Sequence, residues 1–130
     1  VLISFGSFRS PFHLSKVQVQ DHSLHQLRVE DLRTSIVQCG LMQDFLGQAN
    51  VVLIYSAIFQ RLRWRYRERT YRYALLEAGH IAQNGYLAAT SMGMGACAVG
   101  AFMDGDLNAL LDVDGREEAA LYMLAVGKSL

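Results

Sequence analysis

The sequence predicts an α+β fold in which helices pack on a mixed β-sheet, and three observations lead to it. Two runs, 50–59 and 119–126, are apolar at nearly every position, as strands buried on both faces of a sheet are. A long segment, 70–92, repeats apolar residues at three- and four-residue spacing, which is typical of a helix. The chain of 130 residues has room for one such domain with a core.

The N-terminal third carries weaker signals. No element is predicted for residues 1–15, which contain the only proline and mix Gly, Ser and Phe without a period. Residues 16–20 alternate apolar and polar side chains, and 23–28 do so less cleanly after an Asp-His turn. This alternation indicates a small β-hairpin.

Between residues 31 and 66 the signals strengthen. Asp31 can cap a short helix that runs to about Gln38 and stops at Gly40, and a further helical turn follows at 43–46. The run 50–59 is predicted as a central strand. Residues 60–66 then read as a short amphipathic helix.

The helix predicted for 70–92 is apolar around most of its axis, so we expect it to be mostly buried. A buried polar group without a partner costs about 1–3 kcal/mol. Four polar side chains of this helix are therefore expected to be internal anchors or interface contacts: Glu77, His80, Gln83 and Asn84.

After the long helix, a Gly-Met-Gly turn leads into small residues at 96–102, which predict a turn or a short strand. A short helix with acidic residues at its start is predicted for 104–111. The run 119–126 is predicted as a second central strand that ends at Gly127.

Composition excludes several classes of partner. Twelve Lys and Arg balance twelve Asp and Glu, so no global field favours nucleic acid or an anionic membrane. Six arginines nevertheless lie between Arg61 and Arg72 with only Glu68 among them, and this local excess could attract a phosphate. The longest apolar run, 51–59, is far shorter than the roughly 20 residues that span a bilayer. No nucleic-acid or membrane partner is expected.

Two cysteines without a CxxC pair make a disulfide framework improbable, and a cytoplasmic location fits best. Four histidines, with no cysteine at zinc-ligand spacing, predict no metal site. The sequence contains no GxSxG, HExxH or P-loop motif, and its Gly-x-Gly follows a helix where a dinucleotide fingerprint would open one. Hydrolase and dinucleotide-fold readings are therefore disfavoured.

The segment 64–102 carries the most informative pattern. It contains Ala-Gly-His-x-Ala-Gln-Asn-x-x-Leu-Ala-Ala, then the Gly-x-Gly turn, then Cys-x-x-Gly-x-Phe. This order resembles the nitroreductase superfamily, and the prefix Tyr-Arg-Tyr-Ala-Leu-Leu-Glu-Ala-Gly-His is similar to its SagB-type, thiazole/oxazole-forming dehydrogenases. Segments 22–28 and 121–127 agree, so the resemblance spans about residues 20–127.

The resemblance implies an FMN-dependent oxidoreductase that performs two-electron hydride chemistry at flavin N5. Azoline-to-azole oxidation in a peptide is the substrate class that the SagB-type likeness favours, and quinone or nitroaromatic reduction remains open. Residues 16–130 are then the C-terminal part of a nitroreductase-like domain, and 1–15 stay unassigned. Superfamily members are typically homodimers with flavin at the interface, which implies the same here.

A flavin ring needs backbone N–H donors and small side chains for close approach. Small residues at the strand end meet that need, and by resemblance the last two face the flavin: Ala98, Val99, Gly100 and Ala101. The alternative is that these residues only permit tight helix-on-strand packing. Lys128 is the remaining basic residue near the C-terminus that could hold the FMN phosphate.

Tyr66 and Arg65 are the candidate catalytic residues. In azoline-oxidising relatives a Lys-Tyr pair precedes the Tyr-Arg-Tyr stretch and assists proton removal, and here Arg65 replaces the lysine. Arginine stays protonated in proteins, so Arg65 can stabilise an anion but cannot act as the base. Glu77 and His80 are more readily structural anchors, and Cys97 is expected to be an inert core residue.

Two features of the family pattern are missing from this sequence: an N-terminal Arg-rich phosphate motif, and a Ser- and Gly-containing loop before Tyr-Pro. A truncated product, a split domain and a degenerate copy all remain open. A non-catalytic module that acts in dimerisation or complex assembly is therefore the alternative function. The helix 70–92 is expected to pair with its copy in a second chain, with Gly79 and Gly85 bringing the two backbones close. The competing explanation is that the missing N-terminal helices cover the same face in the complete protein.

Overall fold

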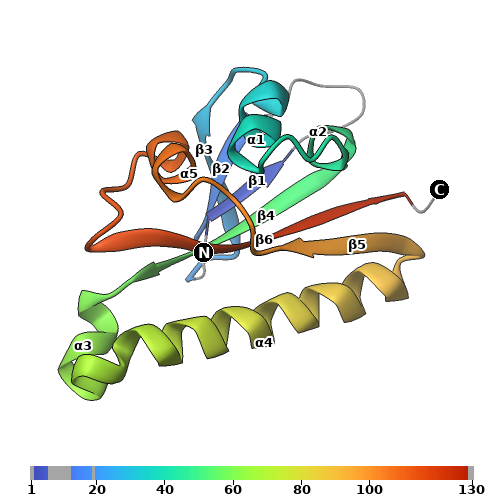
Figure 1. The fold of residues 1–130 in the computed structure, drawn as a ribbon. Coiled ribbons are helices and arrows are strands. Elements are labelled where there is room, and N and C mark those ends of the chain that lie inside the picture. Colours follow the sequence, from blue (N-terminus) through green and yellow to red (C-terminus); the bar gives the residue numbers. More distant parts are fainter. Residues whose placement is uncertain (1, 6–12, 19, 129–130) are drawn as a thin grey trace.

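In the residues that the structure describes, six strands form one sheet, and helices cover both of its faces (Figure 1). The structure, a computed structural model, describes residues 2–5, 13–18 and 20–128. The strands are β1 Leu2–Phe5, β2 His13–Gln18, β3 Ser23–Arg28, β4 Val51–Ile58, β5 Met94–Val99 and β6 Glu118–Lys128. The helices are α1 Arg33–Cys39, α2 Phe45–Gln48, α3 Gln60–Tyr66, the 3-10 turn η1 Arg67–Arg69, α4 Thr70–Ser91 and α5 Asp104–Leu111.

The strand order is β3-β2-β1-β4-β6-β5, and every pair of neighbours among the described strands is antiparallel. The α+β class is confirmed, but the expectation of a mixed sheet is wrong. The connection through α3 and α4 does carry the chain from β4 to a strand of the same direction, β5. However, β6 lies between these two strands and pairs antiparallel with both, so no parallel pair forms.

The most strongly patterned elements lie where the sequence predicts them. The strands β4 and β6 are central, the hairpin β2–β3 forms, and α3 and α5 have the predicted bounds. The helix α1 begins at Arg33, whose N–H donates to the Asp31 carboxylate at 3.1 Å. The turn expected at 43–46 is a helix two residues further along.

The strand β1 was not predicted, and β2 begins three residues before the predicted alternation. Both extra segments fall within residues 1–15, where no element is expected. A strand of four residues is too short to display a period. Its pairing with β2 and β4 comes from distant parts of the chain, which local patterns do not report.

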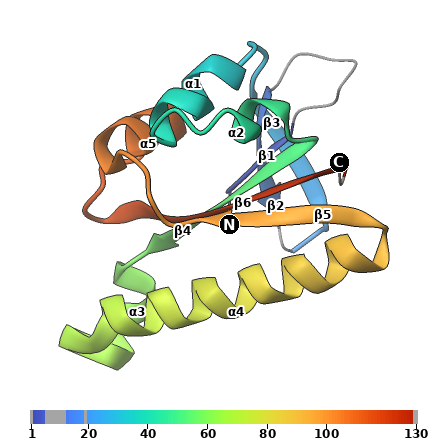
Figure 2. The ribbon, with the colours of Figure 1, turned by 45° about the vertical axis from the view of Figure 1, so that its right-hand side comes forward.

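One face of the sheet carries α1, α2 and α5, which enclose the larger core (Figure 2). Its fully buried side chains come from both helices and strands: Leu14, Ile36, Leu46, Val52, Ile54, Leu107 and Met123. The alternation along β4 places Val52 and Ile54 on this side and Tyr55 on the other. The prediction that β4 is buried on both faces is confirmed.

The opposite face carries α4, which lies along β5 and β6 (Figures 1 and 2). A stripe of small residues at four-residue spacing faces the sheet: Thr70, Ala74, Ala78 and Ala82, followed by Ala89. The remaining faces are exposed in the single chain, including Leu75, Leu76, Ile81 and Leu87. The expectation of a mostly buried helix is therefore wrong for one chain, because a flat sheet covers only one side of a cylinder.

The four polar residues of α4 that were expected to need buried partners are all exposed: Glu77, His80, Gln83 and Asn84. Water can satisfy them. The two glycines of α4 differ as well. A Cβ on Gly85 would lie 2.5 Å from Leu124 Cδ2, so Gly85 faces the sheet, whereas a Cβ on Gly79 would meet open space. Gly85 therefore does not belong to a face that a second chain could approach.

In the described part of the chain, no helix has both the length and the apolar character that a bilayer crossing demands.

Candidate cofactor site

The exposed loop that follows β5 offers two free hydrogen-bond donors. Because β5 is an edge strand, the chain leaves the sheet at Gly100 and Ala101 with both residues exposed. Among the described residues, no hydrogen bond is made by the backbone N–H of either one. Two adjacent N–H groups are thus available to an acceptor from outside the chain.

The loop is fastened from the far side by the α1–α2 segment. Gln43 donates through Nε2 to the carbonyl oxygens of Gly40, at 2.8 Å, and of Ala101, at 3.3 Å. The N–H of Met103 donates to the carbonyl oxygen of Cys39 at 2.8 Å. These bonds hold the loop backbone through the Ala101 carbonyl and the Met103 N–H, while the N–H groups of Gly100 and Ala101 stay open, so these two donors are pre-positioned.

The two residues before the loop, Ala98 and Val99, make other contacts. The N–H of Ala98 donates to the Tyr86 hydroxyl at 2.6 Å, which caps the outer edge of β5. Val99 is 3% exposed and belongs to the core on the α5 side. Of the four predicted positions, only Gly100 and Ala101 therefore present free donors.

Packing does not require the glycine at position 100. A Cβ built there would lie 3.5 Å from Tyr122 Cε2, an ordinary van der Waals contact, and its φ is not in the left-handed region. At Gly100 the structure therefore does not support the alternative in which these small residues only permit tight packing of the helix on the strand. The absence of a side chain leaves room beside the Tyr122 ring for something else to approach.

Tyr66 and Arg65 lie at the C-terminal end of α3. The half-buried Tyr66 ring stacks on Tyr73, with centroids 4.3 Å apart, and the Arg65 guanidinium lies 5.7 Å from the Tyr66 centroid. Among the described residues, none of the hydrogen bonds or ring contacts joins Tyr66 or Arg65 to the loop.

Lys128 lies at the opposite end of the β5–β6 pair. It is paired with Met94, whereas Val99 is paired with Met123, so Lys128 and the loop are separated by roughly 16 Å of strand. The backbone N–H of Lys128 donates to Asn50 Oδ1 at 3.1 Å, and its side chain is exposed. Lys128 can contact only a different part of any molecule that the loop holds.

The two cysteines have opposite environments. Cys97 is exposed on β5, so the expectation of a core residue is wrong. Burial, with the carboxylate of Asp106 as a smaller cause, raises the pKa of the Cys39 thiol. In the described segments, no three His, Cys, Asp or Glu side chains lie close enough together to hold a metal ion.

Two residues of this region were not found from the sequence. Tyr86 was assigned only to the apolar face of its helix, because periodicity does not reveal a hydroxyl that reaches the edge of β5. Gln43 contacts Ala101 across 58 residues of chain, and no local pattern reports such a contact.

The sequence profile of the Nitroreductase family matches residues 10–128, which is most of the chain. The chain belongs to the nitroreductase family. Its members are oxidoreductases, and the α+β fold described above is the family fold.

Two curated relatives are similar to this chain. A protein of Methanocaldococcus jannaschii that carries the name nitroreductase is 36% identical over 109 residues, which cover 84% of this chain and 54% of that protein. The microcin B17-processing protein McbC of Escherichia coli is 32% identical over 82 residues, covering 63% of this chain and 30% of McbC. The chain thus spans about half or less of the relatives that it matches.

Solved structures agree on the fold. A protein of Anabaena variabilis, also named nitroreductase, superposes with a TM-score of 0.87 at 29% identity, covering 96% of this chain and 26% of that one. The Escherichia coli microcin synthetase McbBCD complex with truncated pro-MccB17 bound contains a chain with a TM-score of 0.80 at 23% identity, covering 90% of this chain and 44% of that chain.

Proposed function

We propose that this nitroreductase-family chain is the flavin-holding part of an FMN-dependent, SagB-type oxidoreductase. The observation that carries the proposal is the pair of free N–H groups at Gly100 and Ala101, on an exposed loop with room beside Tyr122. A flavin ring presents acceptors along its edge, and these donors fit that chemistry. When bound, FMN would supply two-electron hydride transfer at its N5 atom.

The chain's own residues then have separate tasks. The N–H groups of Gly100 and Ala101 donate to the ring edge and fix its position, while Gln43 holds the loop rigid from behind. Lys128, at the other end of β5 and β6, contributes a positive charge for the phosphate. Ala98 and Val99 support the loop through the Tyr86 bond and the core, and do not donate themselves.

Tyr66 is proposed to move a proton through its hydroxyl oxygen, and Arg65 to stabilise the anion that results. Arginine remains protonated, so the proton passes at Tyr66 and the charge is balanced by Arg65. Stacking on Tyr73 fixes the direction of the Tyr66 ring. The name of the McbC relative, a microcin B17-processing protein, supports a peptide substrate over a small quinone or nitroaromatic. Azoline rings are the proposed reacting groups of that peptide because of the SagB-type likeness.

We also propose that the chain forms a homodimer. In the described part of one chain, no hydrogen bond or ring contact joins Tyr66 to the Gly100 loop, and α4 exposes Leu76 and Leu87. A second copy packed on α4 would cover this surface and could supply the catalytic residues that one chain's loop lacks. A cytoplasmic location is part of this proposal.

The test is FMN binding by the purified chain, measured by quenching of flavin fluorescence and by flavin retained after desalting. The matched variants are Gly100→Val and Gly105→Val, because a Cβ has room at both positions in the single chain. Gly100→Val is expected to weaken FMN binding at least about tenfold, since its side chain enters the space beside Tyr122. Gly105→Val should bind FMN normally.

Equal FMN affinity in the two variants would contradict the assignment of the loop. A folded chain that takes up no FMN at all would instead favour the alternative, a non-catalytic module acting in dimerisation or complex assembly. The exposed leucines of α4 are the observation that favours that alternative.

A further inference from the structure

A group of arginines covers the junction of α3, η1 and α4, and the fold does not neutralise it. All six are exposed: Arg61, Arg63, Arg65, Arg67, Arg69 and Arg72. Within the described part of the chain, ion pairs join Arg28 to Glu30 and Arg33 to Asp31, and none involves these six arginines. Glu68 is the single acidic residue of the segment 61–72, in a chain whose formal net charge is zero. We call these six residues the arginine surface.

The arginine surface works against the stability of the fold. Arg61 and Arg65 stand one turn apart on α3, where like charges repel. Arg67 has φ 49 and ψ −123, a backbone conformation that favours glycine and strains other residues. Repulsion between like charges and backbone strain both lower the stability of the fold. Their presence in one segment indicates that these residues serve another role.

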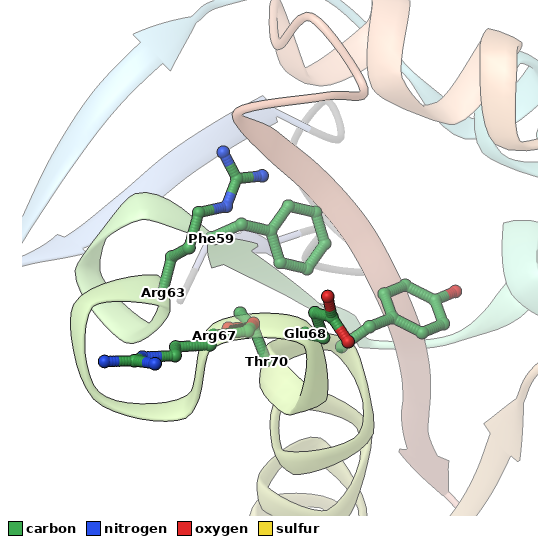
Figure 3. A pocket seen from close by; sticks show the side chains of 6 residues that line it. Phe59, Arg63, Arg67, Glu68 and Thr70 are labelled. Atoms are coloured by element: carbon green, nitrogen blue, oxygen red, sulfur yellow. Dashed lines mark hydrogen bonds between the residues drawn. The ribbon is translucent and has the colours of Figure 1, made fainter.

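Aromatic side chains accompany the charges. Trp64, the only tryptophan, is 77% exposed on α3. The rings of Phe59 and Tyr71, with centroids 5.9 Å apart, line a hollow of about 260 Å³ together with Arg63, Arg67, Glu68 and Thr70. Figure 3 shows the Arg63 and Arg67 guanidinium groups on one side of the Phe59 ring and the Glu68 carboxylate on the other.

We propose that the arginine surface is a docking site for an acidic segment of a partner polypeptide, with Trp64 and the Phe59–Tyr71 hollow taking an apolar side chain of that segment. Exposed Trp, Tyr and Arg together form the composition of energetically dominant protein–protein contacts. The carboxylates of the segment would pair with the arginine forks, which bind them in bidentate fashion. This site does not include the proposed flavin loop, and of its six arginines only Arg65 is also assigned to the proposed catalytic pair.

A polypeptide fits better than a small anion or a nucleic acid. The cations are spread along α3, η1 and the first turn of α4. A single phosphate is held by two or three donors that converge on one point, whereas these arginines extend over a wider distance. A domain that binds nucleic acid usually carries a net positive charge, whereas the acidic residues elsewhere in this chain bring its formal net charge to zero. Glu68 at the hollow would also repel a phosphate backbone.

The single tryptophan makes the test direct. The 130-residue chain is titrated with a short peptide of Glu and Asp that carries one central Leu, and Trp64 fluorescence is followed. We expect a saturable change in fluorescence. The affinity for the peptide should fall several-fold when the salt concentration rises from about 50 mM to about 300 mM. Arg63→Gln with Arg67→Gln should weaken binding at least about tenfold. Lys16→Gln with Arg28→Gln, which removes the same charge from the distant β2–β3 hairpin, should change it less than about twofold.

Arg67→Gly separates binding from folding, because glycine relieves the strained backbone while the cation is lost. This variant should melt roughly 3–6 °C higher and still bind the acidic peptide more weakly. Equal binding of a Lys-containing peptide of the same length would overturn the proposal, as would unchanged affinity in both arginine variants. Tighter binding of inorganic phosphate or of a short single-stranded oligonucleotide would overturn the choice of a polypeptide partner.

Discussion

At the scale of single residues, accessibility decides the chemistry of the two cysteines. Cys97 is exposed on β5 three residues before Gly100, while Cys39, the last residue of α1, is buried and its thiol pKa is raised. The thiolate is the reactive form, so Cys39 should stay protonated and shielded near neutral pH.

Iodoacetamide is therefore expected to label Cys97 in the folded chain and to reach Cys39 only after unfolding, as mass spectrometry of the labelled peptides would record. If FMN binds at the neighbouring loop, saturating FMN should slow the labelling of Cys97. The variant Cys97→Ser should remain unlabelled. Simultaneous labelling of both cysteines would show that the burial of Cys39 is wrong.

Asp114 organises the turn before β6. Its Oδ1 accepts hydrogen bonds from the N–H groups of Arg116, Glu117 and Glu118 at 2.9, 2.8 and 3.1 Å. These bonds, the one from Arg116 first, hold the pKa of the Asp114 carboxyl below its ordinary value in the folded state. A lowered folded-state pKa means that the carboxylate stabilises the fold above the unfolded pKa near 4 and loses this effect as the pH falls through the folded pKa.

The variant Asp114→Asn is expected to melt at a lower temperature than the native chain at neutral pH, with the gap closing below about pH 4. Melting followed by circular dichroism from neutral to acidic pH measures this gap. Asp112→Asn is the control, since Asp112 has φ 58, which asparagine tolerates well. A gap that stays constant down to low pH would contradict the role given to the Asp114 charge.

At the scale of elements, α4 has two glycines with opposite surroundings. Gly85 lies against the sheet, where an added Cβ would meet the fully buried Leu124 at 2.5 Å and the Tyr55 hydroxyl at 3.3 Å. Gly79 faces open space. The close approach of α4 to β6 thus depends on one glycine and not on the other.

Gly85→Ala is expected to destabilise the fold by about 1–3 kcal/mol, because the core has no room for the methyl group. Gly79→Ala should stabilise it by up to about 1 kcal/mol, since alanine is the better helix former. Urea unfolding of both variants measures the two free energies. Gly85→Ala that is as stable as Gly79→Ala would mean that α4 lies further from the sheet than described.

At the scale of the whole molecule, one chain leaves leucines on α4 without a protein neighbour. Leu76 is 53% and Leu87 61% exposed, on the side away from the small-residue stripe. In the proposed homodimer these side chains are covered, and placing a charge there would bury it unpaired. The single chain has a mass of 14.5 kDa.

Light scattering at micromolar concentration should therefore give twice that mass for the native chain, and the single mass for Leu76→Glu or Leu87→Glu. Leu24→Glu, on β3 at the far edge of the sheet, should remain dimeric. A monomeric native chain would contradict the homodimer. It would leave the conclusion from the FMN-binding test unchanged. Charged variants that stay dimeric would move the interface away from this face of α4.

The strands β4 and β6, the helices α3, α4 and α5, and a turn or short strand in the small-residue segment 96–102 could be predicted from the sequence, because each carries its signal locally. Period, apolar composition and turn residues act within a few residues of chain. They also carry the family likeness. The element type of more than half the fold therefore follows from the sequence without tertiary information.

Only the tertiary structure decided how those elements meet. It added β1, placed β6 between β4 and β5, and turned the small residues of α4 rather than its leucines toward the sheet. It also showed that Gly100 and Ala101 keep their N–H groups free while Ala98 does not, and that the Tyr66 ring stacks on Tyr73. These outcomes depend on contacts between residues distant in the chain, whose partners and geometry are absent from any local pattern.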